Sequence, residues 1–154
     1  MLTKNGQKEY NYTMKKIIIT NNPRVYDEFF ASDDPGAAFK DVRYLEGASQ
    51  EEILISARDL IHLGGRLLIH PMMGRKKPHE TPYKSVLMEI PEEGEISAGK
   101  TGTDTMSVVI IEDSLAETKK LLNNTYGMKY SDEILRDLQY IDMLLIKSGA
   151  EECR

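Results

Sequence analysis

The side chains best suited to proton transfer and anion binding lie between His70 and Lys84. His70 and His79 carry imidazoles, which titrate near neutral pH and commonly act as general acids or bases. Arg75 and Lys77 lie between them and can hold the charge of a carboxylate or a phosphate ester. One interpretation is therefore a small enzyme in which His70 or His79 moves the proton.

Metal, thiol and cofactor chemistry are not expected. A metal site of His70, His79 and Glu80 is disfavoured, because no second histidine or carboxylate stands at a metal-like spacing from His70. Cys153 is the single cysteine, so the chain cannot form an internal disulfide. The sequence lacks a dinucleotide motif, a complete phosphate-binding loop and a Gly-x-Ser-x-Gly elbow. No catalytic residue is assigned on these grounds.

Polar residues also follow three predicted strands, at residues 16–20, 42–46 and 66–70. The carboxyl ends of parallel strands share one edge of a sheet, where open α/β folds bind ligands. We therefore expect these polar ends to form one rim. Helices that begin near Pro23 and Ser49 would turn the positive ends of their dipoles to the rim, which favours a small anionic ligand.

The candidate binding residues come from these strand ends and from the basic loop, and each has a structural alternative. Asn21 and Asn22 also suit a turn and a helix cap, and His70 also suits a hydrogen-bonded structural role. The basic residues at 75–77 can equally form a solvated loop. The predicted ligand-binding set is Asn21, Asn22, Ser49, His70, Arg75, Lys77, His79 and Thr81.

The order of predicted elements indicates an α/β fold. Asn22 and Pro23 are typical of a helix N-cap and first turn, and Ser49 begins a capping box for a second helix. Gly64-Gly65 ends that helix. Alternating strands and helices predict parallel strands with right-handed crossovers. We expect a small three-layer sandwich around a mostly parallel sheet of about four strands.

The rest of the chain adds one strand and two helices. Residues 85–90 predict a half-buried edge strand that can run antiparallel. Residues 91–95 and 97–102 are loop by composition. Apolar residues spaced by three and four predict a helix over residues 104–122 and a last helix from Ser131 to about Lys147. The inward side chains of that last helix should be Ile134, Leu135, Leu138, Ile141 and Leu145.

Composition fits one globular domain. The 154 residues are 40% hydrophobic and 29% charged, with a formal net charge of -5. We place the domain at residues 14–150, behind a flexible extension at residues 1–13. No apolar run approaches the roughly 20 residues of a membrane span, and no secretory signal is evident, so a cytoplasmic location is expected. An acidic chain with one basic triplet is not expected to bind nucleic acid.

Three segments of the chain resemble the GrdX family. They are residues 17–23 (IIITNNP), His70-Pro71 and residues 77–85 (KPHETPYKS). The similarity extends from about Met14 through the helix near Leu122, and we expect it to reach the final helix. The chain is accordingly identified as similar to a family that is encoded beside the glycine, sarcosine and betaine reductase genes of amino-acid-fermenting anaerobes.

The resemblance implies an accessory protein of the reductase system, with a reductase subunit as a candidate partner. It implies no activity, and therefore no catalytic residue. The chain departs from the family pattern in residues 1–13 and 33–40, which concerns the start residue, Met1 or Met14. A third interpretation is a pure docking protein, whose proline-stiffened loop binds a reductase subunit.

Overall fold

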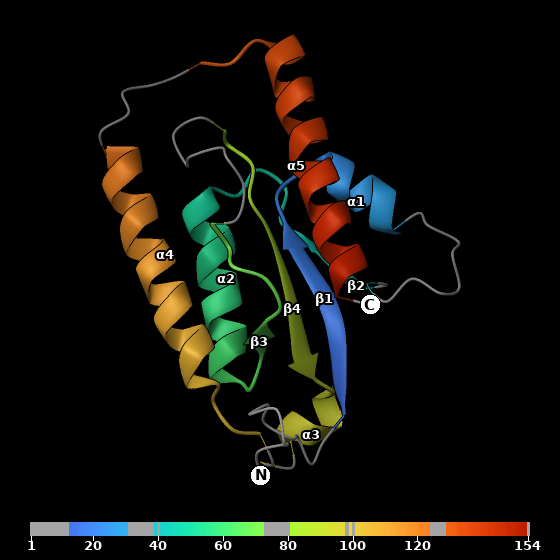
Figure 1. Cartoon of the computed structure of the whole chain (residues 1–154), viewed down its shortest axis with the longest axis vertical. Coiled ribbons are helices and arrows are strands. Elements are labelled where there is room, and N and C mark those ends of the chain that lie inside the picture. The colour runs from blue at the N-terminus through green and yellow to red at the C-terminus, as the bar shows by residue number, and fades with distance from the viewer. Residues whose placement is uncertain are drawn as a thin grey trace.

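A computed structural model describes residues 13–30, 39, 41–72, 81–97, 99, 101–123 and 129–153. The predicted extension at residues 1–13 lies outside this part except for Thr13, whose carbonyl oxygen accepts a hydrogen bond from the Glu92 amide at 3.0 Å. The described elements, shown in Figure 1, are β1 (Met14–Thr20), α1 (Pro23–Phe30), β2 (Asp41–Tyr44), α2 (Gln50–His62), β3 (Arg66–Leu67), β4 (Ser85–Pro91), α3 (Glu93–Ser97), α4 (Thr105–Asn123) and α5 (Asp132–Glu152).

The four described strands form one mixed sheet in the order β2-β1-β4-β3. β1 and β2 pair in parallel, whereas β4 runs antiparallel to both β1 and β3. The prediction of an α/β fold with about four strands is confirmed, but the prediction of a mostly parallel sheet is wrong. β1, β2 and β3 nevertheless point the same way, because β4 reverses direction between β1 and β3. Their carboxyl ends therefore lie along one edge of the sheet.

β4 is a central strand, not the predicted edge strand. Val86, Leu87 and Met88 are each 0% exposed, because helices cover both faces of this strand. A continuous apolar run is typical of such a strand, and the polar residues at its two ends gave the false appearance of alternation. β2 lies at one edge, as expected. β3, at the other edge, is shorter than the predicted strand at 66–70.

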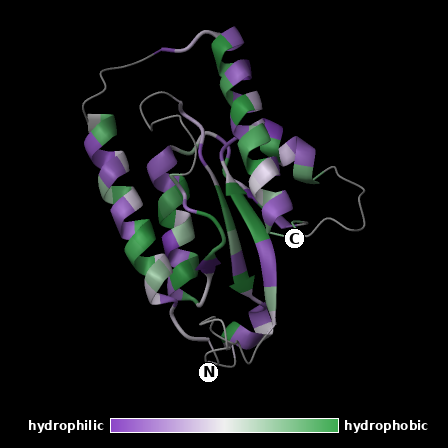
Figure 2. Ribbon diagram, viewed as in Figure 1, coloured by the Kyte–Doolittle hydropathy of each residue, from purple (hydrophilic) through white to green (hydrophobic). Residues whose placement is uncertain are grey.

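Helices cover both faces of the sheet in three layers (Figure 1). α2 and α4 pack on one face, around Ile17, Ile53 and Met88. α1 and α5 pack on the other, around Ile18, Leu87 and further apolar residues of α5. The ribbon in Figure 2 is green, the colour of hydrophobic residues, along much of β4 and at the carboxyl end of β1, which lie between these layers. In the described part of the chain, no helix is long and apolar enough to cross a membrane.

The predicted helix caps are confirmed. The Asn22 side chain accepts from the Arg24 amide at 3.0 Å, and Pro23 is the first residue of α1. Ser49 and Glu52 form the predicted capping box of α2. Gly64 follows α2 with φ +105, and a Cβ there would lie 2.7 Å from Thr101 Cβ, so glycine is required. The predicted helix at residues 104–122 is α4.

Two predictions near the C-terminus are wrong. Residues 91–95 are not only loop, because β4 continues to Pro91 and α3 begins at Glu93. α5 starts after the predicted Ser131 cap but continues past Gly149, and a different face points inward. Ile134 and Ile141 are 49% and 38% exposed. Among the predicted inward residues of α5 only Leu138 is buried; the others buried are Met143, Ile146, Gly149 and Ala150.

Candidate ligand-binding site

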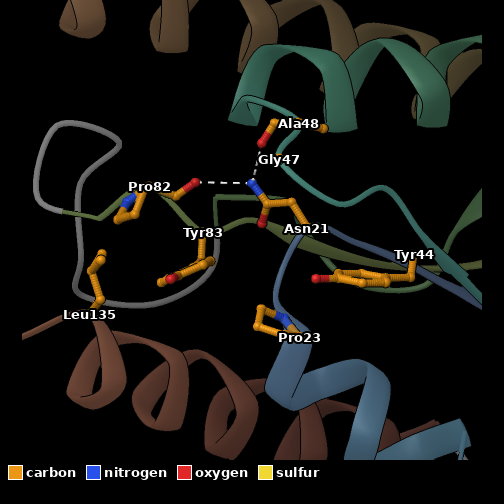
Figure 3. A pocket seen from close by; sticks show the side chains of 8 residues that line it. All are labelled: Asn21, Pro23, Tyr44, Gly47, Ala48, Pro82, Tyr83 and Leu135. Atoms are coloured by element: carbon orange, nitrogen blue, oxygen red, sulfur yellow. Dashed lines mark hydrogen bonds between the residues drawn. The ribbon is translucent and has the colours of Figure 1, made fainter. Parts of the chain in front are cut away.

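The Asn21 side chain joins three chain segments at the carboxyl end of β1. Its amide nitrogen donates to the carbonyl oxygens of Ala48, at 2.8 Å, and Pro82, at 3.0 Å. Its amide oxygen accepts from the Lys84 backbone amide at 2.9 Å. Asn21 thus fixes the segment before α2 and the segment before β4 against the end of β1 (Figure 3).

A pocket with a volume of about 350 Å³ opens beside Asn21, at the carboxyl ends of β1 and β2. Figure 3 shows Asn21 at its centre, with Tyr44 on one side and Tyr83 on the other. Most of its lining residues are apolar or aromatic, as is usual for small-molecule sites, although backbone and hydroxyl groups make the exposed wall as polar as it is apolar. The lining residues are Asn21, Pro23, Tyr44, Gly47, Ala48, Pro82, Tyr83 and Leu135.

Two phenol hydroxyls are the polar side-chain groups of the pocket that can still donate a proton. The Tyr83 hydroxyl accepts from Gln139 Nε2 at 2.7 Å, which leaves its own proton available. The Tyr44 hydroxyl points toward Asn21 in Figure 3 and has no hydrogen-bond partner among the described residues. Burial raises the pKa of Tyr44, and the carboxylates of Glu46 and Asp27 raise it further. Tyr44 is therefore a neutral donor at physiological pH.

An aromatic stack supports Tyr44 from outside the pocket. The rings of Tyr44 and Tyr26 stack with their centroids 5.0 Å apart, and Tyr26 stacks on Phe30 at 4.9 Å. Offset stacks of this kind favour a fixed ring orientation. The Tyr44 hydroxyl is consequently held in place by α1.

A buried hydrogen-bond network lies next to the pocket and joins α5 to the sheet. Asp142 Oδ2 accepts from Asn22 Nδ2 at 2.9 Å and from the Ser85 hydroxyl at 2.8 Å. The Ser85 and Thr20 hydroxyl oxygens are 2.7 Å apart, and Asn22 Nδ2 also donates to the Gln139 carbonyl oxygen at 2.9 Å. We call Thr20, Asn22, Ser85 and Asp142 the α5 anchor.

The α5 anchor contains a carboxyl group whose charge is disfavoured. Burial raises the pKa of Asp142, although the hydrogen bonds from Asn22 and Ser85 and the charge of Lys84 oppose this shift. Burial likewise lowers the pKa of Lys84, against the attraction of Asp142 and Glu117. Lys84 Nζ donates to the Pro71 carbonyl oxygen at 2.8 Å. Asp142 thus joins α5 to Asn22 and Ser85, Lys84 joins the start of β4 to Pro71 after β3, and neither residue lines the pocket.

The structure brings several predicted binding residues to this end of the sheet. Asn21 lines the pocket, and Ser49 and Thr81 adjoin its hydrogen-bond acceptors Ala48 and Pro82. Asn22 is 0% exposed and belongs to the α5 anchor, so its amide is already bonded within the protein.

The other predicted residues lie apart from the pocket wall. Ser49 is engaged in the capping box, and the Thr81 hydroxyl accepts from the Tyr83 amide at 3.2 Å. His70 is exposed, and its Nδ1 accepts from the Met72 amide at 3.1 Å. The predicted contacts of Arg75, Lys77 and His79 lie outside the described residues.

Helix dipoles contribute less to anion binding here than the sequence suggested. The free amides at the start of α1 are reduced by Pro23 and by the Asn22 cap, and α2 carries Glu51 and Glu52 in its first turn. Those carboxylates offset the positive end of the dipole. The polar selectivity of the pocket therefore depends mainly on its hydroxyl groups.

Sequence reasoning missed Tyr44, Tyr83 and Asp142. Tyr44 is the last residue of β2 but the middle residue of the strand predicted at residues 42–46, so the rule that selected Asn21 did not reach it. Asp142 lies between Leu138 and Ile146, which are buried on the same side of α5. A lone carboxylate within an apolar helix face is the signal that identifies a buried polar contact.

The fold and the pocket define a small α/β protein with a ligand-sized pocket at the carboxyl ends of its parallel strands. A family model described as GrdX-like protein matches residues 17–151. The chain therefore belongs to the GrdX-like protein family, and the resemblance seen in the sequence is confirmed. Searches of curated proteins and of solved structures found no match. Among the described residues, no three His, Cys, Asp or Glu side chains are grouped to hold a metal ion.

Proposed function

We propose that this GrdX-like protein is an accessory protein of the glycine reductase system that binds a small anionic ligand, a carboxylate, in the pocket beside Asn21. A reductase subunit is its proposed protein partner. The association with the reductase derives from the family resemblance. The ligand class derives from the polar groups of the pocket.

The observation that carries the ligand proposal is the Tyr44 hydroxyl, a neutral donor that points toward Asn21 and has no partner among the described residues. Asn21 has both amide hydrogens engaged with the Ala48 and Pro82 carbonyls. Tyr44 and Tyr83 thus offer protons to a ligand that brings its own acceptor atoms. A carboxylate does so with two oxygens and makes strong hydrogen bonds to neutral donors.

The test is an NMR titration of the protein with acetate, 4-methylpentanoate and inorganic phosphate. Carboxylates should shift the backbone amides of Gly47, Ala48 and Tyr83, and Tyr44→Phe should weaken their binding about tenfold by removing one charge-assisted hydrogen bond. Because the hydroxyl has no partner among the described residues, this substitution should preserve the fold.

Tyr140→Phe is the matched control, because this tyrosine is 45% exposed on α5 and does not line the pocket. It should bind carboxylates like the unmodified protein. The ligand proposal is rejected if no anion in the panel shifts the pocket amides, or if Tyr44→Phe binds with unchanged affinity.

A further inference from the structure

We propose that the ligand of this pocket is zwitterionic, with an ammonium group beside its carboxylate and a compact apolar body. The inference rests on the proposed carboxylate site and names the rest of the molecule that occupies it. It is carried by two acidic residues that act on Tyr44, Asp27 and Glu46, of which Glu46 directly precedes Gly47 of the lining and Asp27 directly follows Tyr26, whose ring stacks on Tyr44. The carbonyl acceptors in the wall and the apolar lining residues support it.

The described charges nearest Tyr44 are negative. Asp27 on α1 and Glu46 after β2 both act electrostatically on the Tyr44 hydroxyl. A carboxylate alone would meet repulsion from these two side chains, whereas an ammonium group on the same ligand converts the repulsion into attraction.

The described cations of this region are directed elsewhere. The Arg24 guanidinium lies over the Tyr140 ring, 4.9 Å from its centroid, and Lys84 Nζ is bonded to Pro71. Arg43 precedes Tyr44 in β2, so strand alternation turns its side chain to the opposite face of the sheet. In the described part of the site, no side-chain cation offsets Asp27 and Glu46, so an ammonium group on the ligand would be favoured there.

The wall also holds acceptors for an ammonium group. The carbonyl oxygens of Ala48 and Pro82 each take one hydrogen bond from Asn21, and a carbonyl oxygen has a second lone pair. Both residues line the pocket. The tyrosine rings add an environment that attracts cations.

The remaining lining residues determine which apolar group the ligand carries. Pro23, Pro82 and Leu135 give the pocket apolar surface, and its volume of about 350 Å³ exceeds what a carboxylate and an ammonium group need. A branched aliphatic group fits these walls by the ordinary hydrophobic effect. The chemical class is thus an aliphatic amino acid or a close analogue of one.

Three probes of the same shape separate the two charges. Leucine carries both groups, 4-methylpentanoate lacks only the ammonium group, and 3-methylbutylamine lacks only the carboxylate. Calorimetry at low ionic strength should give leucine an affinity about three- to tenfold above that of 4-methylpentanoate. The gain is modest because Asp27 and Glu46 are exposed and their charges are partly screened. The amine should bind more weakly than leucine.

Neutralising Asp27 and Glu46 tests whether their charges cause the preference for leucine. In the double variant Asp27→Asn/Glu46→Gln, leucine and 4-methylpentanoate should bind with about equal affinity. The affinity for 4-methylpentanoate should be unchanged or higher, because the repulsion of its carboxylate is removed. Asp113→Asn/Glu151→Gln makes the same change of charge on exposed residues of α4 and α5, and it should keep the preference.

The outcomes separate this inference from the proposed function. If 4-methylpentanoate binds and leucine binds no tighter, the zwitterion is overturned and the carboxylate site stands. If 3-methylbutylamine binds as tightly as leucine, or if none of the three probes binds, the carboxylate site is overturned as well. A preference for leucine that survives Asp27→Asn/Glu46→Gln also overturns the inference, because its stated cause is then absent.

Discussion

The helices on the two faces of the sheet are held to it in different ways. On one side, α2 and α4 meet the sheet mainly through apolar contacts, with Ile53 and Ile111 0% exposed, and one neutral hydroxyl, Ser107 of α4, accepts from the Leu67 amide of β3 at 3.0 Å. On the other side, α5 adds a carboxylate, Asp142, that is bonded to the sheet and to the cap of α1. Hydrophobic burial selects the packed face where a helix has one apolar stripe. Where a helix has two, buried hydrogen bonds can decide between them.

α5 is a helix with two apolar stripes. Ile134 and Leu144 are 49% and 45% exposed, whereas Met143 and Ile146 are each 5% exposed. The two sets differ little in hydrophobicity, so the transfer of apolar area to the core favours neither strongly. Only the face with Met143 and Ile146 also carries Asp142 into reach of Asn22 and Ser85.

The largest effect on stability is expected from truncating a buried side chain of α5. Ile146→Ala should lower the free energy of unfolding by about 2–4 kcal/mol, since it leaves a cavity between α5 and β4. Leu144→Ala, two residues away on the exposed stripe, should change it by no more than about 0.5 kcal/mol. Urea denaturation of both variants measures the difference.

These two variants test directly whether only one apolar stripe of α5 is buried. Equal losses for Ile146→Ala and Leu144→Ala would mean that both stripes are covered in solution. A larger loss for Leu144→Ala would mean that α5 turns the stripe with Leu144 toward the sheet in solution.

Most of the fold could be predicted because local signals and tertiary structure agree. The Asn22-Pro23 and Ser49-Glu52 caps, Gly64 and the apolar spacing of α4 each depend on neighbouring residues. The position and direction of β4 could not be predicted, because a buried strand has the same composition in a parallel or an antiparallel pair. Strand order depends on contacts between distant segments, and the sequence pattern of residues 85–90 does not encode them.

The candidate site was predicted in part. The rule that polar strand ends share a rim correctly brought Asn21 to a pocket, and it holds although the sheet is mixed. It did not identify Tyr44, which was placed in the middle of the strand predicted at residues 42–46, or Tyr83, which precedes β4 and does not follow a strand. Whether Arg75, Lys77 and His79 contact a ligand stays a prediction.

The second prediction removes the α5 anchor's carboxylate. Asp142→Ala should lower the free energy of unfolding by about 2–3 kcal/mol, because Asn22 and Ser85 then keep buried donors without their acceptor. Asp137→Ala, on the exposed side of the same helix, should change it by no more than about 0.5 kcal/mol and serves as the control. If both variants unfold at the same urea concentration, the anchor does not orient α5.

The smallest effect, and the most specific, is the dependence of stability on pH. Because the pKa of Asp142 is raised above its ordinary value of 3.8, the folded state holds this proton more tightly than the unfolded state. The resulting stabilisation is fully present below pH 3.8 and is lost as pH rises through the folded pKa. Asp142→Asn cannot lose a proton, so the difference in unfolding free energy between the parent and this variant should fall over that window and then stay level.

Measuring this difference by urea denaturation at several pH values cancels the other carboxylates of the chain. Each unit by which the pKa is raised contributes roughly 1.4 kcal/mol to the fall. Lys84 opposes the effect, because its positive charge favours ionised Asp142, so Lys84→Met should enlarge the fall. Asp137→Asn, the same substitution at an exposed position of α5, is the matched control. A parent-minus-variant difference for Asp142→Asn that rises with pH would mean that hydrogen bonds and Lys84 outweigh burial, and that the anchor holds α5 as an ion pair.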